Sequence, residues 1–243
     1  MNIKLLFIPF FFSTFVISQQ YDNVFIEKSK VDKNNKIYQI KNRYNFDVEI
    51  KIDNKNYYLS KINIDSLTSS TNDAIKNIAL EVLKPKLFEG RTNKNQTEIS
   101  YYSIPNLMFK TSTGLVENNQ NIWIHPPRFG FLRSLETCPF PYIILNKPIG
   151  YKWNDAMSIG NYWSDKRWGT WDNRLLLKYN YEIIGEEIIK TPLGNLKSLK
   201  VYSSATSEIG KSILISYFNE TYGFIKLEYT LFNGIKIDLN LIK

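Results

Sequence analysis

The strongest constraint on the fold is an alternation of apolar residues near the end of the printed sequence. From position 199 onward the aliphatic and several aromatic residues fall on odd numbers: Leu199, Val201, Ile213, Ile215, Tyr217, Ile225, Leu227, Tyr229, Leu231, Ile235, Ile237, Leu239 and Leu241. Successive side chains of a strand point to opposite faces, and directly opposed residues of an antiparallel pair share a face. Residues 195–243 are therefore predicted to form antiparallel strands with one common buried face.

The turns between these strands must preserve the odd-numbered face. A two-residue turn at Asn233-Gly234 would mix the faces, whereas a three-residue loop over 232–234 opposes Leu231 to Ile235. Because register follows the buried face, we expect a type I turn with Gly234 in the left-handed region. By the same reasoning, the loop over 219–223 should oppose Tyr217 to Ile225.

With the residues before position 195 included, the predicted fold class is α+β. Residues 46–53 alternate apolar and charged side chains, and residues 57–64 follow as a second strand. Residues 72–84 instead predict a helix, because apolar residues recur there at spacings of three and four and Pro85 follows. We therefore expect mostly antiparallel sheet, curved or half-barrel-like, with one main helix near 72–84.

The first residues are typical of a secretory signal. Lys4 precedes an apolar run that continues through Ile17, and Val16 and Ser18 suit the −3 and −1 positions of a cleavage site. Residues 1–18 are thus predicted to be a signal peptide cleaved after Ser18. The alternative is a retained anchor, although the run is shorter than the ~20 residues that span a bilayer. We expect export to the periplasm or the extracellular space, and no transmembrane span in the mature chain.

Two regions are expected after the signal peptide. Residues 19–120 carry the N-terminal strands and the helix, and residues 121–243 carry an aromatic-rich junction followed by the antiparallel meander. Four prolines between positions 126 and 141 favour irregular chain in that junction. The alternative is that both regions form one continuous domain.

Composition narrows the classes of function. The net charge is +8, but the lysines are scattered among Asn, Asp and Glu and no arginine-rich stripe occurs, so nucleic acid is not a predicted partner. Association with an acidic polysaccharide or with the envelope surface fits better. Cys138 is the only cysteine, which excludes an intramolecular disulfide and predicts a small buried residue. No metal site is predicted, because His125 is the only histidine. No cofactor is predicted either.

No motif assigns catalytic residues. The segment 205–212 resembles a loose phosphate loop, but the residues after Lys211-Ser212 are strand-like, whereas a phosphate loop needs a helix there. No G-x-S-x-G occurs, and His125 before two prolines is interpreted as a loop residue bonded to backbone. A carboxylate pair for glycoside cleavage stays open, with these candidates by neighbourhood only: Asp155, Asp165, Asp172, Glu186 and Glu187.

The aromatic segment 151–171 is the best indication of a ligand surface. Its tryptophans next to Asn, Asp and Arg are suited to stacking a sugar ring or a flat apolar ligand, and two arginines are suited to an anionic group. The candidate binding residues are Trp153, Trp163, Trp168, Trp171, Arg128 and Arg167. The alternative interpretation is that these tryptophans fill the core of the sheet.

Three short pieces resemble a known group of proteins. They are Gly150-Tyr-Lys-Trp153, Thr191-Pro-Leu-Gly194 and the segment Tyr222-Gly-Phe-Ile-Lys-Leu-Glu-Tyr229. Their order over residues 140–243 is similar to that in uncharacterised exported proteins of Gram-negative bacteria, of the TapB type. The resemblance implies a large curved antiparallel sheet, in the manner of lipoprotein-carrier half-barrels. It implies no catalytic residues.

Together these observations favour a non-enzymatic role at the cell envelope, in ligand binding or in structure. A carrier of an apolar ligand predicts a lined cavity that opens to solvent. A carbohydrate-binding module predicts exposed, coplanar tryptophans. A glycan-acting hydrolase predicts two carboxylates facing each other across a cleft.

Overall fold

The protein folds almost entirely as antiparallel β-sheet. The computed structural model describes residues 24–85, 93–105, 107 and 109–243; the predicted signal peptide and its cleavage after Ser18 lie outside these residues. The strands are β1 Arg43–Ile52, β2 Lys55–Ser60, β3 Leu67–Thr68, β4 Ala74–Ile75, β5 Asn77–Val82, β6 Thr97–Ile104, β7 Thr111–Glu117, β8 Asn121–Ile124, β9 Tyr142–Ile144, β10 Lys152–Gly160, β11 Arg174–Thr191, β12 Gly194–Ser207, β13 Gly210–Asn219, β14 Gly223–Thr230 and β15 Lys236–Leu241.

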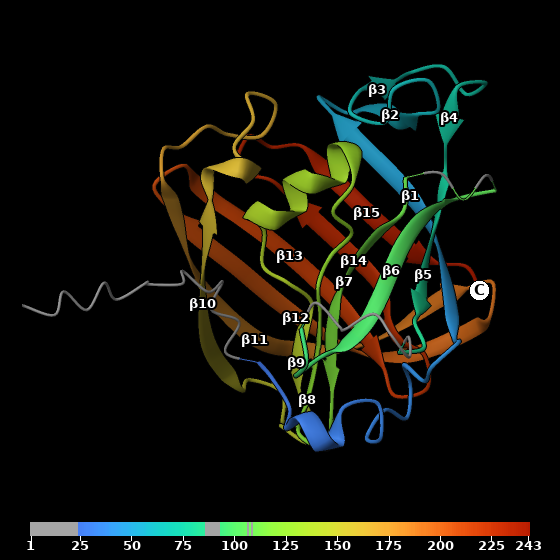
Figure 1. Ribbon diagram of the computed structural model, residues 1–243, viewed down its shortest axis with the longest axis vertical. Coiled ribbons are helices and arrows are strands. Elements are labelled where there is room, and N and C mark those ends of the chain that lie inside the picture. Colours follow the sequence, from blue (N-terminus) through green and yellow to red (C-terminus); the bar gives the residue numbers. More distant parts are fainter. Residues whose placement is uncertain (1–23, 86–92, 106, 108) are drawn as a thin grey trace, which may run out of the picture.

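Three short 3-10 helices accompany the strands in the described residues: η1 Lys28–Lys30, η2 Gly130–Thr137 and η3 Asn161–Trp163. The lime-green η2 lies near the upper end of the sheet in the view of Figure 1. None of the helices in the described ranges is long and apolar enough to cross a membrane.

The sheet curls into a half-barrel (Figure 1). Its strands follow the order β10-β11-β12-β13-β14-β15-β1-β5-β6-β7-β8-β9, and β2 pairs with β1 and with the short strands β3 and β4. The two ends of this order meet through aromatic rings, since Tyr142 of β9 lies 5.6 Å from Trp153 of β10 and 5.4 Å from Tyr181 of β11. The core therefore fills the space that the curved sheet encloses.

The predicted helix near 72–84 is wrong, and the fold is more nearly all-β than α+β. This segment forms β4 and β5, and β5 pairs with β1 on one side and β6 on the other. Ile78, Ala79 and Leu80 are all buried. A strand that is buried on both faces has a continuous run of apolar residues. The periodicity of such a run does not distinguish the strand from a buried helix.

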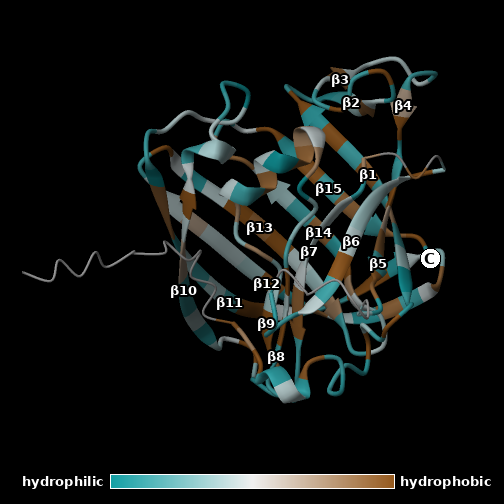
Figure 2. Cartoon of the chain, viewed as in Figure 1, coloured by the Kyte–Doolittle hydropathy of each residue, from teal (hydrophilic) through white to brown (hydrophobic). Residues whose placement is uncertain are grey.

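The C-terminal meander is confirmed for β14 and β15. Leu227 opposes Leu239 and Tyr229 opposes Ile237, as predicted, and all four side chains are buried. Apolar and polar residues alternate along the strands in Figure 2, and in β15 the apolar residues are the buried ones.

The three-residue turn that joins β14 to β15 is also confirmed. The N–H of Leu231 donates to the carbonyl of Ile235 at 2.8 Å, and the N–H of Gly234 donates to the carbonyl of Leu231 at 2.9 Å. Gly234 has φ of +85°, in the left-handed region. Here the buried face and the turn chemistry agree, which is why the register could be read from the sequence.

The predicted parity is wrong for β13, whose buried residues are even-numbered apart from Tyr217 at the bulge. The two-residue turn between the paired residues Ser207 and Gly210 reverses the parity, so that Leu214 rather than Ile213 points to the core. A β-bulge then restores odd parity in β14, because Tyr217 opposes Lys226 and Ile225 is the extra residue. The predicted opposition of Tyr217 and Ile225 is therefore wrong as well.

We expect Gly234→Ala to destabilise the protein by about 1 kcal/mol, because an L residue is strained at this φ. A Cβ at Gly234 would meet no atom within 4 Å, so the backbone strain is the only cost. Urea unfolding followed by circular dichroism measures the effect.

Gly160→Ala is the matched control for this prediction. Its Cβ also meets nothing within 4 Å, but its φ is −77°. We expect this variant to be unchanged or slightly more stable. Equal stabilities of the two variants would contradict a left-handed requirement at Gly234.

Candidate functional site

Trp153 belongs to the interior of the half-barrel. Its ring stacks on that of Tyr181 with centroids 5.2 Å apart and planes 6° apart, and it also stacks on Tyr151. Only 8% of Trp153 is exposed. The hydroxyl of Tyr181 donates to the carbonyl of Phe140 at 3.3 Å, which ties this aromatic layer to the chain after η2. Trp153 therefore offers no ring face for a ligand.

Trp168 and Trp171 anchor the loop between η3 and β11. Trp168 is completely buried, its Nε1–H donates to the carbonyl of Trp163 at 2.9 Å, and its ring meets Phe131 of η2 edge-on at 5.7 Å. Trp171 is 6% exposed, and its backbone N–H donates to Oγ of Ser164 at 3.0 Å. Both residues position the loop and do not present a surface.

Trp163 is the tryptophan that the fold leaves partly exposed. The guanidinium of Arg128 lies 4.6 Å from the centre of its ring, and that of Arg133 lies 5.4 Å from it. Arg133 also covers the ring of Tyr162 at 4.9 Å and donates from Nη2 to the Tyr162 carbonyl at 2.9 Å. Tyr162 is 73% exposed. We call Arg128, Arg133, Tyr162 and Trp163 the arginine–tryptophan cluster.

Buried groups hold Arg128 in this position. Its Nε lies 3.1 Å from Oε1 of Glu136, whose side chain is completely buried on η2. Nδ1 of His125 lies 3.5 Å from the same oxygen. Burial lowers the pKa of His125 well below its usual value, and the positive charge of Arg128 lowers that pKa further. The imidazole is therefore neutral at physiological pH, and Arg128 is the cation that balances Glu136.

Arg133 lacks such an acidic partner: no carboxylate lies within ion-pair distance of it in the described part of the chain. Its guanidinium instead lies against the rings of Tyr162 and Trp163, an arrangement that favours guanidinium over ammonium. The cluster thus contains one arginine neutralised by the core and one whose charge is available at the surface.

Arg167 lies in the loop anchored by Trp168 and is used within the protein. Its Nη2 is 2.6 Å from Oδ2 of Asp165, it donates to the backbone carbonyl of Asp65, and its guanidinium lies 4.7 Å from the Trp168 ring. The hydrogen bond from Arg167 lowers the pKa of Asp165 to about 2. This arginine joins the loop to the β2–β3 connection, so it is less available to an anion than Arg133.

The structure thus brings Arg128 together with Trp163, and Arg167 with Trp168, and places Trp153 elsewhere. Arg133, Tyr162 and Glu136 were missed by sequence reasoning. The adjacent aromatic pair Tyr162-Trp163 was visible in the sequence, but Arg133 and Glu136 stand in the segment interpreted as irregular junction. Only the packing of η2 against the loop after β10 shows that they belong to the same site.

Of the five carboxylates considered for glycoside cleavage, Asp155 lies on β10 opposite Tyr179, and the other four precede β11 or lie along it. Asp165 and Asp172 precede this strand, while Glu186 and Glu187 lie more than ten residues along it, about 40 Å away at ~3.3 Å per residue. Glu186 and Glu187 form ion pairs with Lys197 and Lys200. These two pairs of acids therefore do not face each other across one cleft.

Other predicted features have ordinary structural positions. His125 contacts the carbonyl of Pro126 at 3.4 Å and is buried. Cys138 is buried, and burial raises the pKa of its thiol to about 12. Residues 205–212 form the β12–β13 hairpin, with no helix after Ser212. No group of three metal-ligating side chains occurs among the residues described.

Comparison with known proteins gives similarity to solved structures only. No protein-family model matches the chain, and no curated protein matches it. Three crystal structures are similar to it. "A putative lipoprotein from Parabacteroides distasonis" is 14% identical with a TM-score of 0.47, covering 84% of this chain and 95% of that one.

The second is "the hypothetical lipoprotein YmcC from Escherichia coli", with 11% identity, a TM-score of 0.40, and coverage of 88% and 93% of the two chains. The third is "a putative exported protein with YmcC-like fold" from Bacteroides fragilis, with 11% identity, a TM-score of 0.43, and coverage of 84% and 95%. None of the three descriptions mentions TapB, so that resemblance stays a prediction.

Proposed function

We propose that this chain is an exported, non-catalytic binding protein of the cell envelope that holds an acidic polysaccharide at the arginine–tryptophan cluster. The observation that carries this proposal is the position of Arg133, which stacks on Trp163 and Tyr162 and has no carboxylate partner in the described residues. An acidic sugar supplies both the anion that Arg133 lacks and a ring that stacks on Tyr162.

The surroundings of the cluster support this ligand class. Trp168 and Glu136 are completely buried. Trp168 fixes the loop that carries Trp163, and Glu136 fixes Arg128, so the binding surface is preorganised. Tyr162 keeps most of its ring in solvent. The net charge of +8 attracts an anionic polymer over a longer range.

The other functions considered have less support. A carrier of an apolar ligand needs an open cavity inside the half-barrel, yet the rings of Trp153 and Tyr181 stack there, and Phe140 packs against Tyr179. A hydrolase needs an opposed carboxylate pair, and the acidic candidates at the two ends of β11 are too far apart.

Binding to polygalacturonate tests the proposal, with neutral dextran as the comparison polymer. We expect the protein to bind polygalacturonate but not dextran, and added salt to weaken the binding because exposed charges are screened. The double variant Tyr162→Ala with Arg133→Ala should bind at least tenfold more weakly, as measured by affinity electrophoresis.

Arg43→Ala is the matched control, because Arg43 lies 5.3 Å from the ring of Tyr102 in a similar cation–aromatic pair on β1. We expect this variant to bind polygalacturonate like the unaltered protein. Unchanged binding in the double variant, or equal binding of both polymers, would overturn the proposal. Circular dichroism shows whether each variant is folded.

A further inference from the structure

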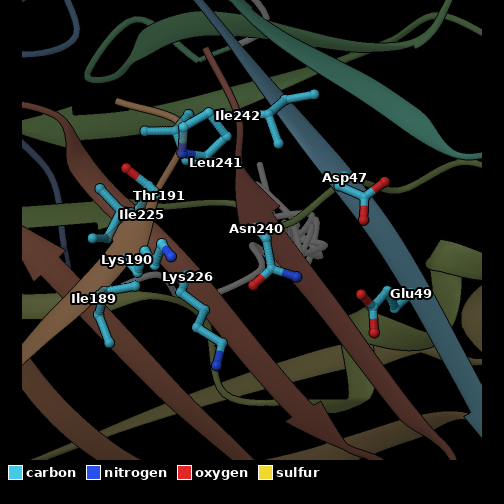
Figure 3. A pocket seen from close by; sticks show the side chains of 11 residues that line it. Asp47, Glu49, Ile189, Lys190, Thr191, Ile225, Lys226, Asn240, Leu241 and Ile242 are labelled. Atoms are coloured by element: carbon cyan, nitrogen blue, oxygen red, sulfur yellow. The ribbon is translucent and has the colours of Figure 1, made fainter. Parts of the chain in front are cut away.

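A hollow lies on the outer face of the sheet, where the tip of the β11–β12 hairpin meets β14, β15 and β1 (Figure 3). Its volume is about 290 Å³. The hairpin tip contributes Ile189, Lys190, Thr191 and Pro192, and the strands contribute Asp47, Glu49, Ile225, Lys226, Asn240, Leu241 and Ile242. This site is separate from the arginine–tryptophan cluster and does not depend on the function proposed above.

Charges of opposite sign stand on opposite sides of this hollow. Figure 3 shows Asp47 and Glu49 on β1 at one side, Lys190 and Lys226 at the other, and Asn240 between them. Two of the four charges already have partners, since Glu49 pairs with Lys51 at 3.3 Å and Lys226 pairs with Glu228 at 2.6 Å.

The other two charges, those of Asp47 and Lys190, have no ion pair in the described part of the chain. Asp47 is half-buried, and burial raises the pKa of its carboxyl group, with Glu49 adding to the increase and Lys76 offsetting part of it. An approaching ammonium group would favour the ionised carboxylate. Lys190 is exposed at the hairpin tip and is free to meet an anion.

The distance between the two sides sets the size of the ligand. Asp47 on β1 and Lys226 on β14 both oppose Asn240 on β15, so they are separated by two strand spacings, or about 10 Å. Lys190 of the hairpin tip lies on the Lys226 side (Figure 3). An extended tripeptide spans at most ~10 Å between its ends. Ile189 and Pro192 of the hairpin tip supply apolar surface for small side chains beside Lys190.

We infer that this hollow binds a short zwitterionic peptide of about three residues. Its terminal ammonium group lies at Asp47, its terminal carboxylate lies at Lys190, and Asn240 hydrogen-bonds to its backbone. A single amino acid is too short to reach both charges, and a diamine lacks the anion for Lys190.

Titration calorimetry with trialanine tests this inference, with N-acetyl-trialanine and trialanine amide as blocked forms. We expect trialanine to bind at least tenfold more tightly than either blocked form. Asp47→Asn should weaken the binding of trialanine about tenfold and leave the N-acetyl form unchanged. Lys190→Met should also weaken the binding of trialanine about tenfold, and it should leave the binding of trialanine amide unchanged.

Asp172→Asn and Lys178→Met are the matched controls, because both residues are exposed and neither lines the hollow. Both should bind trialanine normally. Absence of trialanine binding at millimolar concentration, equal binding of the blocked forms, or unchanged binding in both Asp47→Asn and Lys190→Met would overturn the inference. The four substitutions are at exposed or half-buried polar positions, so each variant should fold.

Discussion

Replacing Trp168 with alanine is expected to lower the free energy of unfolding by about 3–5 kcal/mol, the range for removing a large aromatic side chain from a core. Trp168 is completely buried and is among the largest such side chains of the molecule. The substitution removes its edge-on contact with Phe131 and its hydrogen bond to the carbonyl of Trp163. Urea unfolding followed by circular dichroism measures the loss.

The same substitution should also impair the arginine–tryptophan cluster, because Trp168 holds the backbone of Trp163 in place. Tyr162→Ala is the control, since its side chain is 73% exposed and surface substitutions usually change stability by no more than 0.5 kcal/mol. A loss below about 1 kcal/mol for Trp168→Ala would contradict the role of Trp168 as the anchor of this loop.

The second large effect is expected at Glu117, a buried carboxylate at the end of β7. It accepts three backbone N–H bonds from the segment before β1: Lys36 and Ile37 donate to Oε1 at 2.7 and 2.8 Å, and Tyr38 donates to Oε2 at 2.8 Å. The adjoining Tyr38 side chain is buried and its hydroxyl accepts from the N–H of Phe224 at 3.0 Å. Glu117 thus fixes the N-terminal segment to the sheet.

Glu117→Ala should destabilise the protein by about 3–5 kcal/mol, because it leaves two buried donors and one part-buried donor without acceptors, and each buried group costs about 1–3 kcal/mol. Glu117→Gln keeps one acceptor oxygen, so it should lower the free energy of unfolding by less than Glu117→Ala does. Urea unfolding gives the free energies, and hydrogen exchange at the Phe224 amide should accelerate in the alanine variant if residues 36–38 detach.

Glu220→Ala is the control for Glu117, because Glu220 is exposed in the turn before β14. We expect its stability to be unchanged. If Glu117→Ala were as stable as Glu220→Ala, the three hydrogen bonds would contribute nothing net, and the N-terminal segment would have to be held by its apolar contacts alone.

The candidate site was only partly predictable, for reasons visible in its residues. Trp163 and Arg128 were proposed together from composition, and they do lie in contact. Sequence gave no means to separate Trp163 from Trp153 and Trp168, because burial depends on which element covers each ring. Arg133 and Glu136 reach the site through η2, a short 3-10 helix within a segment whose prolines favoured irregular chain.

The sequence by itself determined the register of β14 and β15 and the left-handed turn at Gly234, because a period of two and the steric freedom of glycine are local properties. Tertiary structure alone decided that residues 74–82 are strand rather than helix, since burial on both faces by β1 and β6 overrides an ambiguous apolar pattern. It also decided the reversed parity of β13, which follows from the two-residue turn between Ser207 and Gly210. The packing of η2 against η3, finally, placed Arg128 and Arg133 against Trp163, which lies 30 or more residues further along the chain.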